Sequence, residues 1–171
     1  LRLCGQLTTG GELLAGTCKP ERHRVDLTAL LDGIADDVAP LLERAGRRFV
    51  YRGLPAAVTA DADAQLVERA VYNLLSNALK FTPAGGRVTV SLRFERKQVL
   101  LTVTDTGGGI PVERMETVFD GYLHPERLAA LPCGLGLGLP LCRRIAEGHG
   151  GRMVLDSRPD QGTSVTLALP D

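Results

Sequence analysis

Near its middle the chain reads Asn73-Leu74-Leu75-Ser76-Asn77-Ala78-Leu79-Lys80-Phe81-Thr82-Pro83. The first part of this stretch, 73–80, is the end of a longer run, 61–80, in which apolar residues recur every three or four positions. This is the spacing of a helix with one buried face. The two apolar rows of that face are Leu66, Ala70, Leu74 and Ala78, and Val67, Val71, Leu75 and Leu79. The pattern predicts a long amphipathic helix, which Pro83 and the following glycine pair would end.

Three polar side chains lie along one edge of the apolar stripe of this helix. Asn73, Asn77 and Lys80 fall within about 60° of one another on a helical projection. Asn77 lies angularly between Leu66 and Ala70, so we expect its amide to be partly buried and to need partners. From these residues alone two interpretations stay open. The trio is either a structural asparagine beside a surface lysine, or an amide oxygen that binds Mg²⁺ with a lysine that meets phosphate.

The rest of the chain alternates between strand and helix patterns. Strands are expected at 47–52, 57–60, 87–95, 99–104, 152–157 and 163–169, the middle pair joined through Arg96-Lys97 and the last pair forming a closing hairpin. A second helix should begin at the N-cap Asp26, with Pro40 kinking or weakening its last turn. A third should follow Gly138 and end near Gly148. The predicted fold is α+β: a two-layer α/β sandwich with helices on one face of a mixed, mostly antiparallel sheet.

Two glycine-rich stretches carry possible ligand chemistry. The first, Asp105-Thr106-Gly107-Gly108-Gly109-Ile110-Pro111, follows a predicted strand, where an aspartate could accept a hydrogen bond from the exocyclic amine of a ligand. The second, Gly134-Leu135-Gly136-Leu137-Gly138-Leu139-Pro140, opens a helix, where free amides bind phosphate. The second stretch is neither a Walker A loop nor a dinucleotide fingerprint. Taken singly, the first is equally compatible with a turn capped by the aspartate, and the second with a hinge or a close-packed helix start.

Composition excludes some classes of function. The 171 residues suit one domain with at most a short appendage. Twenty basic residues balance 20 acidic ones, so no large net field favours nucleic acid or an anionic membrane, and we expect no nucleic-acid partner. The four cysteines form no CxxC pair, which indicates a reducing compartment. No apolar run approaches the roughly 20 residues that span a bilayer.

The motifs in combination resemble a known family. An NxxxNxxK helix, DxGxGI, GxGxGL and a final hairpin occur in the order typical of the nucleotide-binding (Bergerat) fold of histidine kinases, type II topoisomerases, large heat-shock chaperones and mismatch-repair ATPases. Within that superfamily, 73–83 resembles the N box of sensor histidine kinases, 105–111 the G1 box and 134–139 the G2 box. Val118-Phe119-Asp120-Gly121-Tyr122 resembles the F box. The resemblance covers about 25–170.

The resemblance implies roles for individual residues, with ATP and Mg²⁺ as cofactors. Asn77 would bind Mg²⁺, and Asn73 and Lys80 would contact phosphate groups or the water shell of the metal, which makes these three the implied catalytic residues. Asp105 would accept from the adenine amino group, and Thr163 would support the same edge through water. The remaining implied nucleotide contacts are Gly107, Gly109, Ile110, Phe119, Tyr122, Arg127, Gly134, Leu135, Gly136, Leu137, Gly138 and Leu139. Residues 111–133 would form a mobile lid, anchored by Phe119 and Tyr122, with Arg127 neutralising the γ-phosphate.

One substitution separates a kinase from a hydrolase. In topoisomerase-type relatives, the position four residues before the metal-binding asparagine is a glutamate that acts as a general base for water. Here that position is Asn73, whose amide cannot take up a proton near neutral pH. The resemblance therefore implies transfer of the γ-phosphoryl group to a histidine on a dimerisation domain. From there the group would pass to an aspartate of a response regulator.

The implied organisation places 1–18 at the end of the dimerisation domain, 19–25 in a linker and 26–171 in the ATP-binding domain. His23, His124 and His149 do not match the phosphoacceptor box, so we expect the acceptor upstream, and we expect His149 to cap a helix. The resemblance implies a cytoplasmic domain, with any inner-membrane anchor of the full-length protein also upstream. Two alternatives stay open: a degenerate nucleotide-binding module, because Leu135 replaces a more usual Thr or Ser, and an anti-sigma-factor-type serine kinase.

Overall fold

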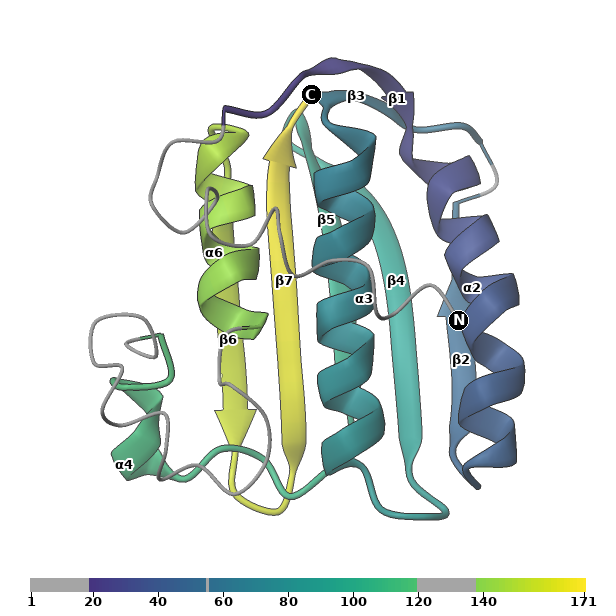
Figure 1. The fold of residues 1–171 in the computed structure, drawn as a ribbon, viewed down its shortest axis with the longest axis vertical. Helices are drawn as coiled ribbons and strands as arrows, with labels where there is room; N and C mark the ends of the chain where they lie inside the picture. The colour runs from purple at the N-terminus through teal and green to yellow at the C-terminus, as the bar shows by residue number, and fades with distance from the viewer. Residues whose placement is uncertain (1–18, 55, 120–137) are drawn as a thin grey trace.

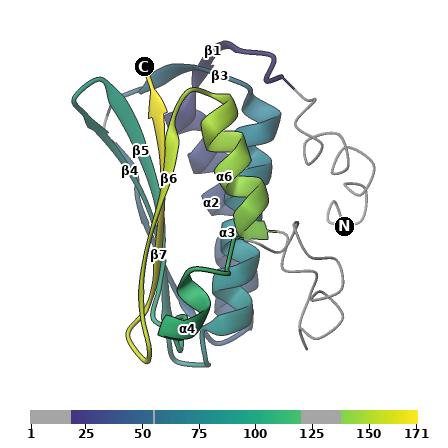
Figure 2. The same ribbon diagram turned by 90° about the vertical axis from the view of Figure 1, so that its left-hand side faces the viewer.

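A computed structural model of the chain describes residues 19–54, 56–119 and 138–171. A five-stranded sheet forms one layer, and helices α2 (Leu27–Arg44), α3 (Ala64–Phe81) and α6 (Gly138–Gly148) cover one face of it (Figures 1 and 2). Its strands are, in spatial order, β2 (Arg48–Arg52), β4 (Arg87–Glu95), β5 (Gln98–Asp105), β7 (Gly162–Pro170) and β6 (Arg152–Arg158). Only the β2–β4 pair is parallel. The predicted sandwich with a mostly antiparallel sheet is confirmed.

The core lies between the sheet and the helices, and it is built from the apolar residues that recur every second position in the strands and every three or four positions in the helices. In the three central strands, most residues that point toward the helices are at most 5% exposed: Val88, Val90, Leu92, Val99, Leu101, Val103, Val165, Leu167 and Leu169. Helix α3 buries Leu66, Val67, Ala70, Val71, Leu74, Leu75 and Ala78 against them. Both predicted rows of α3 therefore face the core, apart from Leu79, which is half-buried.

The opposite face of the sheet is polar. The Oγ1 atoms of Thr102 and Thr166 lie 2.9 Å apart, and Thr104 Oγ1 lies 3.0 Å from Ser164 Oγ, so hydroxyl pairs bridge β5 and β7 on this face. Cross-strand pairs of this kind stabilise a sheet that has one solvated side. Among the described residues no helix covers this face.

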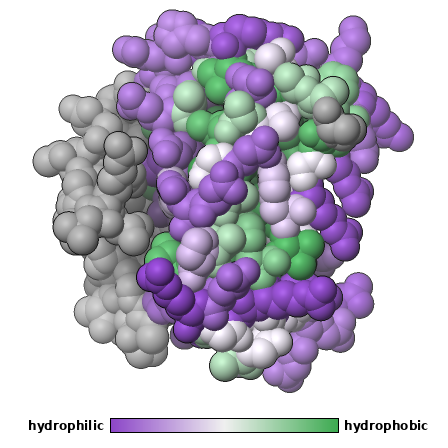
Figure 3. Space-filling model, turned by 90° about the vertical axis from the view of Figure 1, so that its right-hand side faces the viewer, coloured by the Kyte–Doolittle hydropathy of each residue, from purple (hydrophilic) through white to green (hydrophobic). Residues whose placement is uncertain are grey.

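Helix α2 begins as predicted. The Oδ1 atom of Asp26 accepts hydrogen bonds of 3.0 Å from the amides of Thr28 and Ala29, which satisfies two of the free donors at the helix start. The helix continues through Pro40 to Arg44, so the proline, which lacks one amide donor, does not end it. The fully buried Leu42 holds the turn that follows Pro40 against the core. The outer side of α2 and β2 is mixed, with hydrophilic side chains around a central region that contains hydrophobic ones (Figure 3).

Three segments differ from the prediction. His23–Asp26 forms strand β1 in the interval predicted as a linker, and it pairs antiparallel with β3 (Thr59–Ala62). Strand β3 itself lies two residues beyond the predicted 57–60. Helix α4 (Val112–Met115) was not predicted. Strand β1 is mostly exposed, so its sequence has no apolar alternation from which a strand could be predicted. It forms through its backbone pairing with β3.

None of the helices in the described ranges is both long and apolar enough to cross a membrane.

The β4–β5 hairpin yields a prediction about stability. Both turn residues, Arg96 (φ 50°) and Lys97 (φ 60°), adopt positive φ, which suits Asn-Gly far better than two long side chains. The double substitution Arg96→Asn, Lys97→Gly should therefore raise the free energy of unfolding by about 1 kcal/mol, measured by urea denaturation. The control Arg96→Ala, Lys97→Ala removes the same two charges but keeps a Cβ at position 97, and it should give no such gain. A double variant no more stable than the wild type would contradict the prediction.

Candidate functional site

The polar edge of α3 forms one wall of the candidate site. Asn73 and Asn77 are half-buried, and Lys80 is exposed, with its Nζ 5.2 Å from the centroid of the Phe81 ring. The expectation that the amide of Asn77 is partly buried is confirmed. The Nδ2 atom of Asn73 is buried and has no hydrogen-bond partner within the described parts of the chain. Since buried polar atoms are nearly always paired, this donor is suited to a ligand.

Helix α6 begins directly beside these asparagines. A Cβ atom added to Gly138 would lie 3.3 Å from Asn77 Nδ2 and 4.0 Å from Asn73 Cβ. The amides at a helix N-terminus, together with the helix dipole, favour an anion such as phosphate. The structure therefore brings the end of the second glycine stretch to the polar edge of α3, which is the arrangement that a phosphate group with a bound cation needs.

Asp105 lies at the end of β5 and forms the other half of the candidate site. Its Oδ1 atom accepts a 2.7 Å hydrogen bond from the amide of Gly107. Burial raises the pKa of Asp105, while the amides of Gly107 and Thr163 act in the opposite direction. Thr163 faces Asp105 in the register of β5 and β7. A partly buried carboxylate held in this way can accept a further hydrogen bond from an amine.

The first glycine stretch fits closely between two other parts of the chain. A side chain at Gly107 would collide with the carbonyl oxygen of Phe81, at the end of α3. A side chain at Gly109, which has a φ of 68°, would collide with the carbonyl of Arg158 in the β6–β7 hairpin. The amide of Asp160 also donates a 2.8 Å hydrogen bond to the carbonyl of Gly108. Glycine is thus required here, and the turn joins the Asp105 half of the site to α3.

Ser157, on β6, is a residue of the site that the sequence analysis missed. Its Oγ accepts a 2.9 Å hydrogen bond from the amide of Ile110, donates to the carbonyl of Gly162 at 3.1 Å, and lies 2.8 Å from Thr163 Oγ1. It therefore links the glycine turn to Thr163. The predicted closing hairpin contained a signal for it, because its register places Ser157 opposite Thr163.

The described part of the predicted lid lies against α6 and β6. The ring of Phe119 is 5.3 Å from the guanidinium carbon of Arg143 and borders a groove of about 340 Å³ that also includes Met115 and Met153. None of these neighbours is a residue that we expect to contact the nucleotide, so the nucleotide contact of Phe119 stays a prediction. Six predicted site residues fall outside the described residues: Tyr122, Arg127, Gly134, Leu135, Gly136 and Leu137. Leu139 is half-buried and packs on the core.

The possible metal ligands around Asn77 suit a cation that is bound together with phosphate. In the described ranges no group of three or more His, Cys, Asp or Glu side chains could hold a metal ion. Mg²⁺ commonly takes one or two protein oxygens and completes its shell with phosphate and water oxygens. An amide oxygen of Asn77 next to an anion-binding helix start fits that pattern.

Comparison with known proteins relates this chain to ATP-binding proteins. Residues 62–171 match the family model described as histidine kinase-, DNA gyrase B- and HSP90-like ATPase. The chain is 38% identical over 150 residues to the adaptive-response sensory kinase SasA of Rippkaea orientalis, covering 86% of this chain and 38% of SasA. It is 42% identical over 116 residues to the histidine protein kinase DivJ of Caulobacter vibrioides, covering 68% of this chain and 19% of DivJ. The solved structure of the mycobacterial sensor histidine kinase MprB has 30% identity and a TM-score of 0.69, with 87% of this chain and 97% of that one covered.

The carboxylate of Asp105 yields a prediction about base selectivity. In Asp105→Asn, the amide oxygen can still accept from Gly107, but an NH₂ group then faces the ligand. The NH₂ group of the variant side chain and the amino group of adenine would then be two donors that face each other, which costs about 1–3 kcal/mol in a partly buried site. The affinity for adenosine, measured by calorimetric titration, should therefore fall about tenfold or more. Asp156→Asn, on the exposed face of β6, should not change it.

The stability of Asp105→Asn shows whether a loss of adenosine affinity comes from the site itself or from unfolding of the variant. Because burial raises the pKa of Asp105, its ionised form lowers the stability of the fold at pH values above that pKa. The neutral asparagine variant should therefore be at least as stable as the wild type at pH 7. Unchanged adenosine affinity in a folded Asp105→Asn variant would count against the adenine role.

Proposed function

This chain belongs to the family of histidine kinase-, DNA gyrase B- and HSP90-like ATPases, as an ATP-binding catalytic domain of the sensor histidine kinase type, and we propose that it positions Mg-ATP for phosphoryl transfer to a histidine. The observation that carries the proposal is the meeting of Asn73 and Asn77 with the start of α6 at Gly138. The chain spans 38% of SasA and 19% of DivJ, so the activity, substrates and partners of the whole protein belong to this proposal.

In the proposed complex, each half of the site holds one end of the nucleotide. Asp105, supported by Gly107 and Thr163, accepts from the adenine amino group. Gly107 and Gly109 let the backbone pass close to the nucleotide, and Ile110 contacts it. Asn77 supplies an oxygen to Mg²⁺, and Asn73 and Lys80 face the phosphates. The bound Mg²⁺ would neutralise phosphate charge during transfer. Residues 134–139 complete the phosphate site, and Phe119, Tyr122 and Arg127 contribute from the lid.

The same residues favour transfer over hydrolysis. Asn73 stands where a hydrolase of this superfamily needs a general base, and an amide cannot accept the proton of an attacking water. The Nδ2 of Asn73, which is buried and has no partner among the residues that the structure describes, is instead a donor, suited to an oxygen of the phosphate or of its water shell. Catalysis would then rest on orientation and on neutralisation of charge.

The partners we propose follow from the family. The phosphoryl acceptor is a histidine of an upstream dimerisation domain, and a response-regulator aspartate receives the group next. We place the domain in the cytoplasm, whether or not the whole protein is anchored in the inner membrane. SasA and DivJ are named as kinases, which favours a histidine kinase over a degenerate module or a serine kinase of the anti-sigma-factor type.

Asn77→Ala tests the metal role. Loss of the amide oxygen should weaken binding of Mg-ATP at least about tenfold, the scale seen when the support of a metal ligand is lost. Binding of ATP in the presence of EDTA should change little, because the amide oxygen acts through the cation. Ser76→Ala, at an exposed neighbouring position on α3, is the control. Equal dependence on Mg²⁺ in Asn77→Ala and the wild type, by calorimetry, would exclude this role for Asn77.

A second prediction concerns phosphoryl transfer. Incubated alone with ATP labelled on the γ-phosphate, the chain should retain no alkali-stable label, because none of its three histidines lies in a phosphoacceptor box. With a separate dimerisation domain of a close relative added, label should appear on that domain. Stable label on this chain alone would contradict the proposed division of roles.

A further inference from the structure

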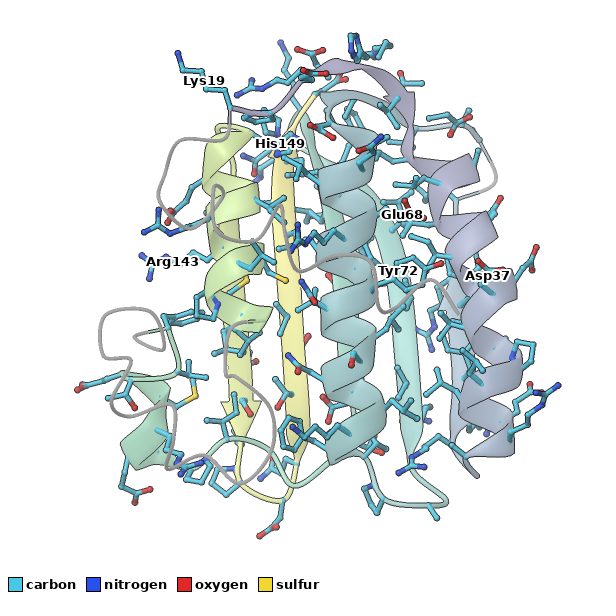
Figure 4. All side chains as sticks on the ribbon, in the orientation of Figure 1. Lys19, Asp37, Glu68, Tyr72, Arg143 and His149 are labelled. Atoms are coloured by element: carbon cyan, nitrogen blue, oxygen red, sulfur yellow. The ribbon has the colours of Figure 1, made fainter. Side chains whose placement is uncertain are left out.

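A buried histidine joins the ends of α3 and α6 that lie away from the candidate phosphate site. His149 is 0% exposed and lies between the upper ends of the two helices (Figure 4). Its amide closes α6 on the carbonyls of Ile145 and Ala146, which confirms the expected capping role. The imidazole ring, however, does more than close its own helix.

The ring bonds to both helices at once. Nε2 lies 2.9 Å from the backbone nitrogen of Asp63, the residue that precedes α3, and accepts a hydrogen bond from it. Nε2 must therefore carry no proton, and the proton lies on Nδ1, which donates to the carbonyl of Ile145 at 2.7 Å. Asp63 in turn caps α3, because its Oδ1 accepts a 3.1 Å hydrogen bond from the amide of Leu66.

The segment that leads into β1 is tied to the same point. The amide of Glu21 donates to Asp63 Oδ2 at 3.0 Å, and the guanidinium of Arg22 donates to the carbonyl of Gly148 at 2.7 Å. One of these bonds holds the start of α3 and the other holds the end of α6. The two helix ends are therefore joined by His149 inside the protein and by residues 21–22 at its surface.

The opposite ends of the two helices carry the phosphate half of the candidate site. The helices run antiparallel and touch midway, where Cys142 Sγ lies 3.4 Å from the carbonyl of Ala70. Gly138 then meets Asn77, about 21 Å along α3 from Asp63 at 1.5 Å per residue. Packed side chains and the weak hydrogen bond from the Cys142 thiol to the carbonyl of Ala70 restrict sliding at the middle of the pair, and the two hydrogen bonds of His149 fix the axial position at its far end. Because a helix is stiff along its axis, a shift at His149 displaces Gly138 relative to Asn77.

We propose that His149 is a positioning residue of the nucleotide site: it fixes the axial register of α3 and α6, and thereby the spacing between Asn77 and the start of α6 at Gly138. This inference rests on the proposed function, since it assigns the phosphate end of ATP to that spacing. The adenine end is built differently. Asp105 and Thr163 belong to paired strands, and Gly107 packs against the carbonyl of Phe81 at the end of α3. Their positions are therefore set by the sheet and by α3, not by α6. Loss of His149 therefore weakens phosphate binding and spares adenine binding.

The test compares two ligands and two substitutions by calorimetry on the whole chain, well below its unfolding temperature. His149→Phe keeps a ring but leaves the amide of Asp63 unpaired, and it should bind Mg-ATP about tenfold more weakly, with adenosine affinity unchanged. His149→Gln can present an amide oxygen near the former position of Nε2, and it should restore most of the Mg-ATP affinity. Val38→Ala, a core truncation in α2, serves as a control for lowered stability and should bind both ligands like the wild type.

A surface substitution keeps the proposal testable if His149→Phe does not fold. Arg22→Ala loosens the same end of α6 from an exposed position and should weaken Mg-ATP binding about threefold. Its control, Arg24→Ala, removes only the ion pair with Asp171 and should change nothing.

Three results would overturn the inference. His149→Phe could bind Mg-ATP like the wild type, or it could lose both ligands equally, as general loosening would cause. Should that variant not fold, equal Mg-ATP affinities of Arg22→Ala and Arg24→Ala would do the same. A wild-type chain that binds no Mg-ATP would instead overturn the proposed function.

Discussion

The packing of α3 against α6 is the contact on which the candidate site depends. The helices approach closely because the residues at their seam are small: Ala70 faces Cys142 midway, and Gly138 faces Asn77 at the end. Apolar burial holds the pair together but tolerates sliding, because it is proportional to area and has no direction. Hydrogen bonds restrict that freedom: the Cys142 thiol bonds to the carbonyl of Ala70 midway, and the His149 ring bonds to the amide of Asp63 at the far ends. The proposed phosphate half of the site therefore relies in part on contacts that lie at the far ends of both helices.

The half of the site that we propose for adenine has a different support. Asp105 and Thr163 lie opposite each other on β5 and β7, so the hydrogen-bond ladder of the sheet fixes their spacing. The glycine turn after Asp105 then connects this half to the end of α3, since Gly107 lies against the carbonyl of Phe81. In the proposed complex, a sheet and a helix pair would thus hold the two ends of one ligand. The two supports can be disturbed separately, because they share only this turn.

The sequence was most informative where one periodicity ran long and unbroken. The rows of α3 and the alternation of β4 and β5 predicted these elements closely, because each buries one full face. Prediction failed where burial is slight. Strand β1 is mostly exposed and exists through its backbone pairing with β3, and the helical turn α4 buries none of its residues. Pro40 lies inside α2, which continues to Arg44, and the expected kink or weakening of its last turn stays a prediction.

The sequence by itself determined the layers, the strands of the two hairpins and the residue types of the site, because periodicity and glycine placement are local properties of the chain. The candidate residues Asn73, Asn77 and Asp105 could all be named from their motifs. Only the tertiary structure decided which of them meet. The contact of Gly138 with Asn77, the bridging hydroxyl of Ser157 and the two bonds of the His149 ring join residues up to 86 positions apart in the chain. Such contacts depend on how helices and strands are packed, which no local pattern encodes.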